Sequence, residues 1–194
     1  MLRVLPGEIF KIPVLATTQN KKRLGEFCPE LSLDKDHKTL IQDDKTLFSM
    51  LYGRLFFLGL SRLMLRNFAL PDSNSTNCPS TPNVRVAMAT LPAPLECVIV
   101  GIESHICVTQ TALDLLRAGH KVYVLADGVS SCNKEEIPIA LARLRAEGAI
   151  VTTSESWIYE CVGDAGLQEF KQVIGLIKES HDSTKEALHA LCKI

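Results

Sequence analysis

Cys107 is the side chain of this 194-residue sequence that is best placed to act as a nucleophile. It follows the apolar run 97–100, which is typical of a buried strand, and it precedes apolar residues at helical spacing. A cysteine at the start of a helix is favoured as a thiolate, because free N–H groups and the helix dipole stabilise an anion there. The same N–H groups are candidates for an oxyanion hole. By position alone, a buried structural cysteine is an equally good interpretation, since free cysteine is among the most buried residue types.

The elements that must position Cys107 alternate between strands and helices after residue 96. One further strand is predicted earlier, at 12–17. Since each strand is apolar on both sides, the alternation predicts right-handed crossovers and a doubly wound α/β domain, a parallel sheet with helices on both faces. The predicted elements after residue 96 are strands at 97–100, 121–126 and 149–152, and helices that begin near 108, 137, 157 and 167.

Ligands bind at the carboxyl ends of the strands in a sheet of this kind. The loops 101–107, 127–134 and 152–156 are therefore expected to line one crevice. His105 is a candidate proton acceptor in the first loop, although a histidine that faces solvent at a helix start is the favoured interpretation. Cys132, on the second loop, leaves open a thiol redox sensor in which it would resolve the oxidised nucleophile.

The composition favours a small-molecule ligand in an intracellular protein. A formal net charge of −1, without a dense Lys/Arg tract among aromatics, argues against a nucleic-acid partner. The seven cysteines lack a CxxC or Cys/His ligand spacing, which indicates reduced thiols in a cytoplasmic protein and no metal site.

The N-terminus lacks the apolar run of roughly 7 to 15 residues of a secretory signal. The apolar stretch 55–70 is interrupted by Arg62 and Arg66 and is shorter than the ~20 residues of a membrane helix, so no membrane insertion is expected.

Three segments of the second half resemble the isochorismatase-like cysteine hydrolases. Residues 101–112, with the sequence GIESHICVTQTA, are similar to the nucleophile motif of that superfamily. Residues 126–131 and 149–155 are similar to its two later strand ends. The resemblance implies a Rossmann-like three-layer fold, which agrees with the doubly wound sheet predicted from the alternation.

The first half resembles the isochorismatase domain-containing branch of this superfamily. Residues 12–19 are similar to its second strand, and residues 45–50 to its lysine motif. We expect a single domain over 1–180, with an atypical insertion at 52–83 and a polar tail at 181–194.

The resemblance implies a catalytic Cys107 and a catalytic Lys45, whose ammonium helps to hold the thiolate or the developing oxyanion. It also implies a cis peptide bond between Ile102 and Glu103. It implies no cofactor and no metal, a small-molecule substrate and a homo-oligomer. The residues expected in the oxyanion hole and cis-peptide region are Ile102, Glu103, Ser104, Ile106 and Cys107, and those expected in the pocket are Gln19, Phe48, His105 and Ser130.

One part of the family's catalytic unit has no counterpart in this sequence. The family's aspartate ends a first strand that precedes the one matching 12–17, and the sequence lacks that strand. Asp43 and Asp44 adjoin Lys45 but follow the wrong strand, so we expect them to be solvated loop acids. Without the central strand the sheet would have to close up, recruit 52–83 or borrow a strand from another subunit. The two anomalies together suggest a truncated or misassembled gene product.

Two functions remain open on this evidence besides the thiol redox sensor, which is the least favoured. The first is a hydrolase of a small amide, or of an enol ether where the family does not use the thiol. The second is a non-catalytic family member, or a truncated product, that binds a small ligand or a partner subunit. The missing aspartate makes enzymatic activity the uncertain point, because the thiol has no carboxylate to accept its proton.

Overall fold

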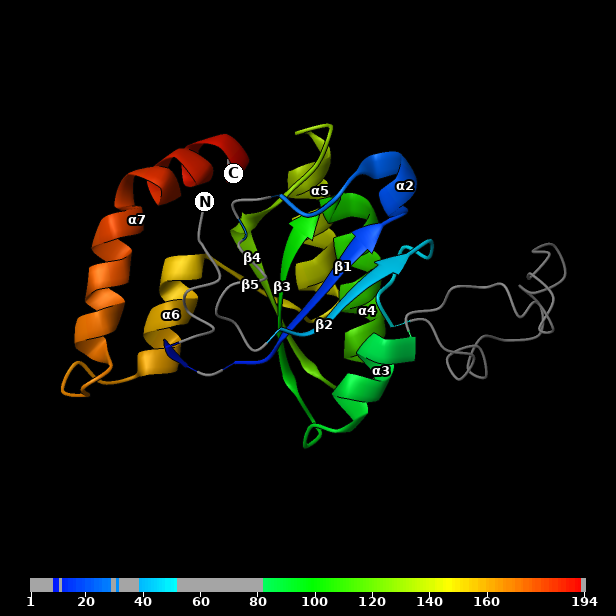
Figure 1. Ribbon diagram of the computed structural model, residues 1–194. Coiled ribbons are helices and arrows are strands. Elements are labelled where there is room, and N and C mark those ends of the chain that lie inside the picture. Colours follow the sequence, from blue (N-terminus) through cyan, green and yellow to red (C-terminus); the bar gives the residue numbers. More distant parts are fainter. Residues whose placement is uncertain (1–8, 11, 29–30, 32–38, 52–81, 193–194) are drawn as a thin grey trace, which may run out of the picture.

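The strands of the computed structural model form two sheets, each made of parallel strands, which lie beside each other in Figure 1. In the smaller sheet β1 (Val14–Gln19) pairs with β2 (Thr39–Lys45). The larger sheet has the order β3-β4-β5, from β3 (Glu96–Ile102), β4 (Lys121–Ser130) and β5 (Ile150–Thr152). The structure describes residues 9–10, 12–28, 31, 39–51 and 82–192.

The helices lie between the strands in the chain and cover the larger sheet on both faces. The turn that follows β3 is π-helical, η4 (Ser104–Val108), and it continues directly into α4. The helices are α2 (Lys21–Leu24), α3 (Pro82–Ala89), α4 (Thr109–Arg117), α5 (Glu136–Ala146), α6 (Ser154–Val162) and α7 (Phe170–Leu191). No helix in the described ranges is long and apolar enough to cross a membrane.

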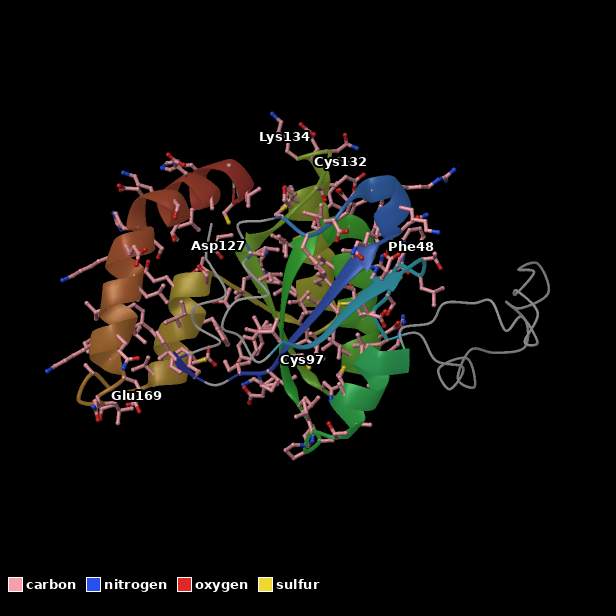
Figure 2. All side chains as sticks on the ribbon, in the orientation of Figure 1. Phe48, Cys97, Asp127, Cys132, Lys134 and Glu169 are labelled. Atoms are coloured by element: carbon pink, nitrogen blue, oxygen red, sulfur yellow. The ribbon has the colours of Figure 1, made fainter. Side chains whose placement is uncertain are left out.

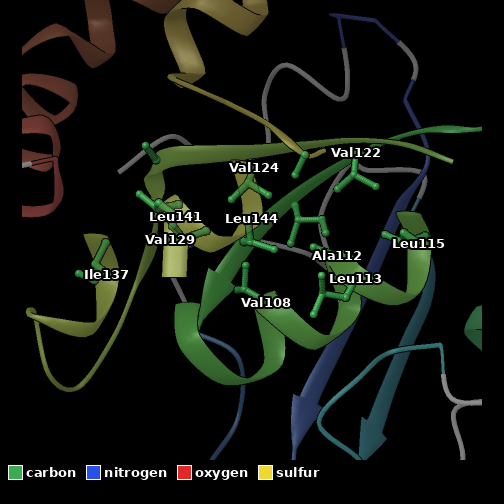
Figure 3. Packing of buried hydrophobic residues seen from close by; sticks show 13 residues of the cluster. Val108, Ala112, Leu113, Leu115, Val122, Val124, Val129, Ile137, Leu141 and Leu144 are labelled. Atoms are coloured by element: carbon green, nitrogen blue, oxygen red, sulfur yellow. The ribbon is translucent and has the colours of Figure 1, made fainter. Parts of the chain in front are cut away.

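The central strand β4 is buried on both faces, because its side chains alternate between two apolar clusters. Val122 and Val124 pack with residues of α4 and α5, as Figure 3 shows. Tyr123 and Leu125 point the other way and pack with Trp157 and other residues of α6 and α7. The predicted doubly wound α/β sheet with helices on both faces is therefore confirmed.

Two elements extend further than the sequence predicts. The Asp127-Gly128 pair was expected to end a strand at residue 126, but β4 continues to Ser130. Glycine is needed at 128, since a Cβ atom there would lie 2.8 Å from Cγ1 of Val100. The segment expected to be a polar tail from residue 181 is helical, because α7 continues to Leu191.

The extension of α7 has a physical cause that its polar composition hides. Thr184 is buried, and both Leu191 and Cys192 pack against the larger apolar cluster. One narrow stripe of the helix is therefore enough to hold it.

No hydrogen-bonded strand pairing joins the two sheets within the described residues. β1 and β3 each pair with a strand on one side only. Val100 and Ile102 of β3 are 59% and 67% exposed, although they lie in an apolar strand. The atypical segment 52–83 lies outside the described residues, apart from the start of α3.

Candidate active site

Cys107 lies in the π-helical turn η4, between the buried residues Ser104 and Val108. Val108 is anchored in the core cluster, and Cys107 itself is half-buried. The peptide bond between Ile102 and Glu103 is cis, as the resemblance implied. The helical turn begins at Ser104, three residues before Cys107, whereas the sequence predicted Cys107 at the helix start. The thiol therefore lies within the first turns of a continuous helical segment.

The backbone N–H groups around Cys107 are partly occupied. The N–H groups of Ile106 and Val108 both donate to the carbonyl oxygen of Glu103, at 3.1 and 3.2 Å. The N–H of Ser104 donates to Oγ of Ser131, at 3.2 Å. Of the expected oxyanion-hole donors, the N–H groups of Ser104 and Ile106 are thus already engaged.

Lys45 is the last residue of β2, and it is only 3% exposed. Its ammonium donates hydrogen bonds to three uncharged oxygens: Oε1 of Gln19 at 2.5 Å and the carbonyls of Leu47 and Phe48, each at 2.9 Å. Burial lowers the pKa of Lys45, because removing the ammonium from water disfavours the charged form. Interaction with the Cys107 side chain and, to a smaller extent, with Asp44 opposes this lowering of the Lys45 pKa.

Gln19 links the lysine to the cysteine. It is the last residue of β1 and is paired in register with Lys45. Its oxygen Oε1 lies 3.9 Å from Sγ of Cys107 and accepts the thiol hydrogen bond, while Nε2 donates to the carbonyl of Thr46 at 2.8 Å. The predicted residues Cys107, Lys45 and Gln19 therefore come together from three different elements.

The Asp44 carboxylate does not face the thiol, because Asp44 lies on the opposite side of β2 from Lys45. Its carboxylate accepts hydrogen bonds from Oγ1 of Thr18 and from the N–H of Lys21, both at 2.9 Å. These bonds, with the Lys21 N–H first, lower the pKa of Asp44.

The prediction that Asp43 and Asp44 belong to a loop is wrong, because both lie within β2. The sequence hid this strand, since three of its seven residues are charged.

The loop after β4 is fastened to the nucleophile turn by Ser131, which the sequence analysis missed. Its hydroxyl lies 2.6 Å from Oγ of Ser104 and 2.9 Å from Nδ1 of His105. The N–H of Cys132 donates to the Glu103 carboxylate at 2.6 Å. The predicted meeting of these two loops is thus confirmed, and His105 is held by Ser131. A run of polar residues directly after a buried strand was the signal for Ser131.

The remaining predicted pocket residues lie at the same end of the strands. Ser130 is half-buried and paired in register with Ile102 at the ends of β4 and β3. Phe48 contributes its carbonyl to Lys45, and its side chain is 50% exposed. Figure 2 shows Phe48 and Cys132 toward the carboxyl ends of the strands, with Cys97 toward the opposite end. All four predicted pocket residues therefore lie near the strand ends, although only Gln19 hydrogen-bonds to Cys107 among the described contacts.

A second missed residue, Thr111, holds the lysine loop in place. It is buried in α4, one turn after Cys107, and its Oγ1 accepts a hydrogen bond from the N–H of Met50 at 3.1 Å. Within the described residues, no three His, Cys, Asp or Glu side chains come together as metal ligands would. The six described cysteines are free thiols.

Comparison with known proteins identifies the family. A profile of the isochorismatase domain matches residues 93–156. The secreted isochorismatase effector Isc1 of Phytophthora sojae is 34% identical over 177 residues, which cover 91% of this chain and 71% of that protein. The chain belongs to the isochorismatase family. Isochorismatase domain-containing protein 1 of Salmo salar is also 34% identical, over 92% of this chain and 52% of that protein. The chain thus spans between about half and seven tenths of the length of these two relatives.

Solved structures agree with this hydrolase-like family assignment. A structure of MAR1 ribonuclease from Caenorhabditis elegans superposes with a TM-score of 0.67 at 30% identity, over 89% of this chain and 72% of that chain. The YcaC gene product from Escherichia coli, described as an octameric hydrolase of unknown specificity, gives a TM-score of 0.64 at 17% identity, over 95% of this chain and 76% of that chain. The second likeness shows the fold alone.

Proposed function

We propose that this chain is a cysteine hydrolase that cleaves a small amide, with Cys107 as nucleophile and Lys45 as its cationic partner. The observation that carries the proposal is the buried ammonium of Lys45, which interacts with the Cys107 side chain while its three hydrogen-bond acceptors are neutral oxygens. A buried cation is stable only with hydrogen bonds and a counter-charge. In this site Cys107 and Asp44 are the groups that can supply the counter-charge.

The proposed reaction uses these two groups in both half-reactions. The Cys107 thiolate attacks the amide carbon, and a C–S bond forms as the C–N bond breaks. The Lys45 ammonium gives its proton to the leaving amine, a transfer that a lowered pKa makes easier. Neutral Lys45 then takes a proton from the water that hydrolyses the thioester, which regenerates the ammonium and the thiolate. The N–H of Cys107 is the donor proposed for the oxyanion.

A specific observation favours a second candidate, a non-catalytic member that binds a small ligand through the same residues. The atom that accepts the Cys107 thiol hydrogen bond is the amide oxygen of Gln19, which is far less basic than a carboxylate.

Turnover of a panel of small amides separates the two candidates, with Cys107→Ala as the test variant and Cys132→Ala as the control. We expect turnover that Cys107→Ala abolishes and Cys132→Ala retains. A folded chain without turnover on any amide would favour the binding module. Because one structural relative is described as a ribonuclease, a short RNA belongs in the panel.

Thiol reactivity gives a test of the site that needs no substrate. Iodoacetamide near neutral pH should alkylate Cys107 at least about tenfold faster than the exposed Cys28 and Cys132, because the Lys45 ammonium lies beside Cys107. Burial raises the pKa of the half-buried Cys97 and Cys192 thiols, so these should react slowest. Peptide mass spectrometry over time measures each rate. Equal rates at Cys107, Cys28 and Cys132 would contradict an activated nucleophile.

The location and assembly of the protein are also proposals. The sequence favours an intracellular, cytoplasmic protein, whereas the Phytophthora sojae relative is named a secreted effector. A homo-oligomer is supported by the family resemblance and by the Escherichia coli structure, which is described as octameric. Cell fractionation and light scattering test these two points.

A further inference from the structure

We propose that Gln19 is the positioning residue of this site, whose amide oxygen keeps the Lys45 ammonium beside the Cys107 sulfur. The inference rests on the proposed function, since it concerns the same nucleophile. It starts from one atom, because Oε1 of Gln19 accepts a hydrogen bond from Nζ of Lys45 at 2.5 Å and lies 3.9 Å from Sγ of Cys107.

The orientation of the Gln19 amide is fixed by its two ends. Nε2 donates to the carbonyl of Thr46 at 2.8 Å, and Oε1 faces the Lys45 ammonium. A flipped amide would place two donors together at Lys45 and two acceptors together at Thr46, which is unfavourable at both ends. The side chain therefore has one stable orientation, and that orientation presents an acceptor to the site.

The strand ladder fixes where this acceptor lies. Gln19 and Lys45 are register partners at the carboxyl ends of β1 and β2, so their side chains leave the sheet on the same side. The preceding pair, Thr18 and Asp44, points to the other side and is joined by its own hydrogen bond. Within the described residues, no strand pairing joins β1 and β2 to the larger sheet, whose strand β3 leads into the turn that carries Cys107. The hydrogen bond from the Cys107 thiol to Gln19 therefore links the smaller sheet directly to the nucleophile.

This arrangement gives Gln19 a function that packing alone would not require. Lys45 is 3% exposed and has no water to turn to if one of its acceptors is removed. Without Oε1, the ammonium would rely on the carbonyls of Leu47 and Phe48, which follow it in its own chain segment. It would then be drawn toward its own loop and away from Cys107.

The test is the pH dependence of Cys107 alkylation by iodoacetamide. We expect Gln19→Leu to move the pH midpoint upward by about one unit, equivalent to a tenfold loss of thiolate at neutral pH. Gln19→Glu adds a negative charge near the thiol, so it should also raise the pH midpoint of Cys107 alkylation. Because it keeps an acceptor for Lys45, it should retain the turnover that Gln19→Leu loses. Gln172→Leu, at an exposed position of α7, is the control and should leave the midpoint unchanged.

A double-mutant cycle shows whether Gln19 acts through Lys45. In a Lys45→Met background, adding Gln19→Leu should cause no further shift, because the ammonium is already gone. An unmoved midpoint in Gln19→Leu, or a shift of equal size in the Lys45→Met background, would overturn the inference. Alkylation reports on Gln19 even if no amide is cleaved, so failure of the inference and failure of the proposed hydrolase are distinguishable.

Discussion

At the scale of single residues, the buried ammonium of Lys45 dominates the chemistry of the site. Its three hydrogen bonds to neutral oxygens satisfy its donors, whereas its charge interacts with the side chains of Cys107 and Asp44. A positive charge held in this way makes a nearby cysteine reactive, and it also costs folding free energy. Function and stability therefore oppose each other at this residue.

That opposition predicts a pH dependence of stability. Burial lowers the pKa of Lys45 below 10.5, so the unfolded chain binds more protons at this residue than the folded chain between the two pKa values. The contribution of Lys45 to the free energy of unfolding should accordingly rise with pH toward 10.5. Relative to Lys45→Met, the wild-type protein should gain stability between pH 7 and pH 10 in urea titrations. Lys178 is exposed, so Lys178→Met is the control variant. If the difference in free energy of unfolding between the wild-type protein and Lys45→Met did not change with pH, this account would be contradicted.

At the scale of secondary-structure elements, two caps of different burial hold the start of α6. The Asp127 carboxylate, at 7% exposure, accepts the N–H of Ser154 at 2.8 Å and also the Ser154 hydroxyl. Thr153 accepts the N–H of Ser156 at 3.3 Å on the surface. The first cap joins β4 to α6, whereas the second is local to the helix.

We expect Asp127→Ala to destabilise the fold more than Thr153→Ala. The first change leaves two buried donors of Ser154 without an acceptor and should cost ~2 to 4 kcal/mol. The second removes one exposed cap, for ~1 kcal/mol. Urea unfolding monitored at Trp157, which lies in α6, measures both. Equal losses would mean that α6 is held by its apolar contacts alone.

At the scale of the whole molecule, β1 and β3 each pair with one strand only among the described residues. An unpaired edge is a template for pairing with another strand, and natural proteins usually cover or charge it. Here β3 instead presents Val100 and Ile102, both more than half exposed.

We therefore expect concentration-dependent self-association through these edges. Val100→Lys should weaken it by about tenfold, ~1.4 kcal/mol, because a lysine on an edge strand disfavours strand pairing. Ile139→Lys is the matched control, since Ile139 is 65% exposed but lies on α5. Light scattering over a range of concentrations measures the association. Equal effects of the two substitutions would indicate general hydrophobic association and not edge pairing.

Much of the larger sheet could be predicted from the sequence because its signals are local. The apolar run at 97–100 and the alternation of strands and helices after it require burial on both faces, whatever the neighbours are. β2 could not be predicted in this way, since Asp43, Asp44 and Lys45 make it look like a loop. It forms because β1 offers a ladder of backbone partners, which is a property of the fold and not of the segment.

The sequence by itself determined the doubly wound α/β class, the family and the identity of Cys107 and Lys45 as the residues of interest, because each is encoded in a contiguous segment. Only the tertiary structure decided how these residues meet. The meeting of Gln19, Lys45 and Cys107 depends on strand register and on contacts between residues up to 88 positions apart. The place of Ser131 beside the nucleophile turn likewise depends on two strand ends that lie side by side. The spacing of residues along the sequence does not predict such long-range contacts directly.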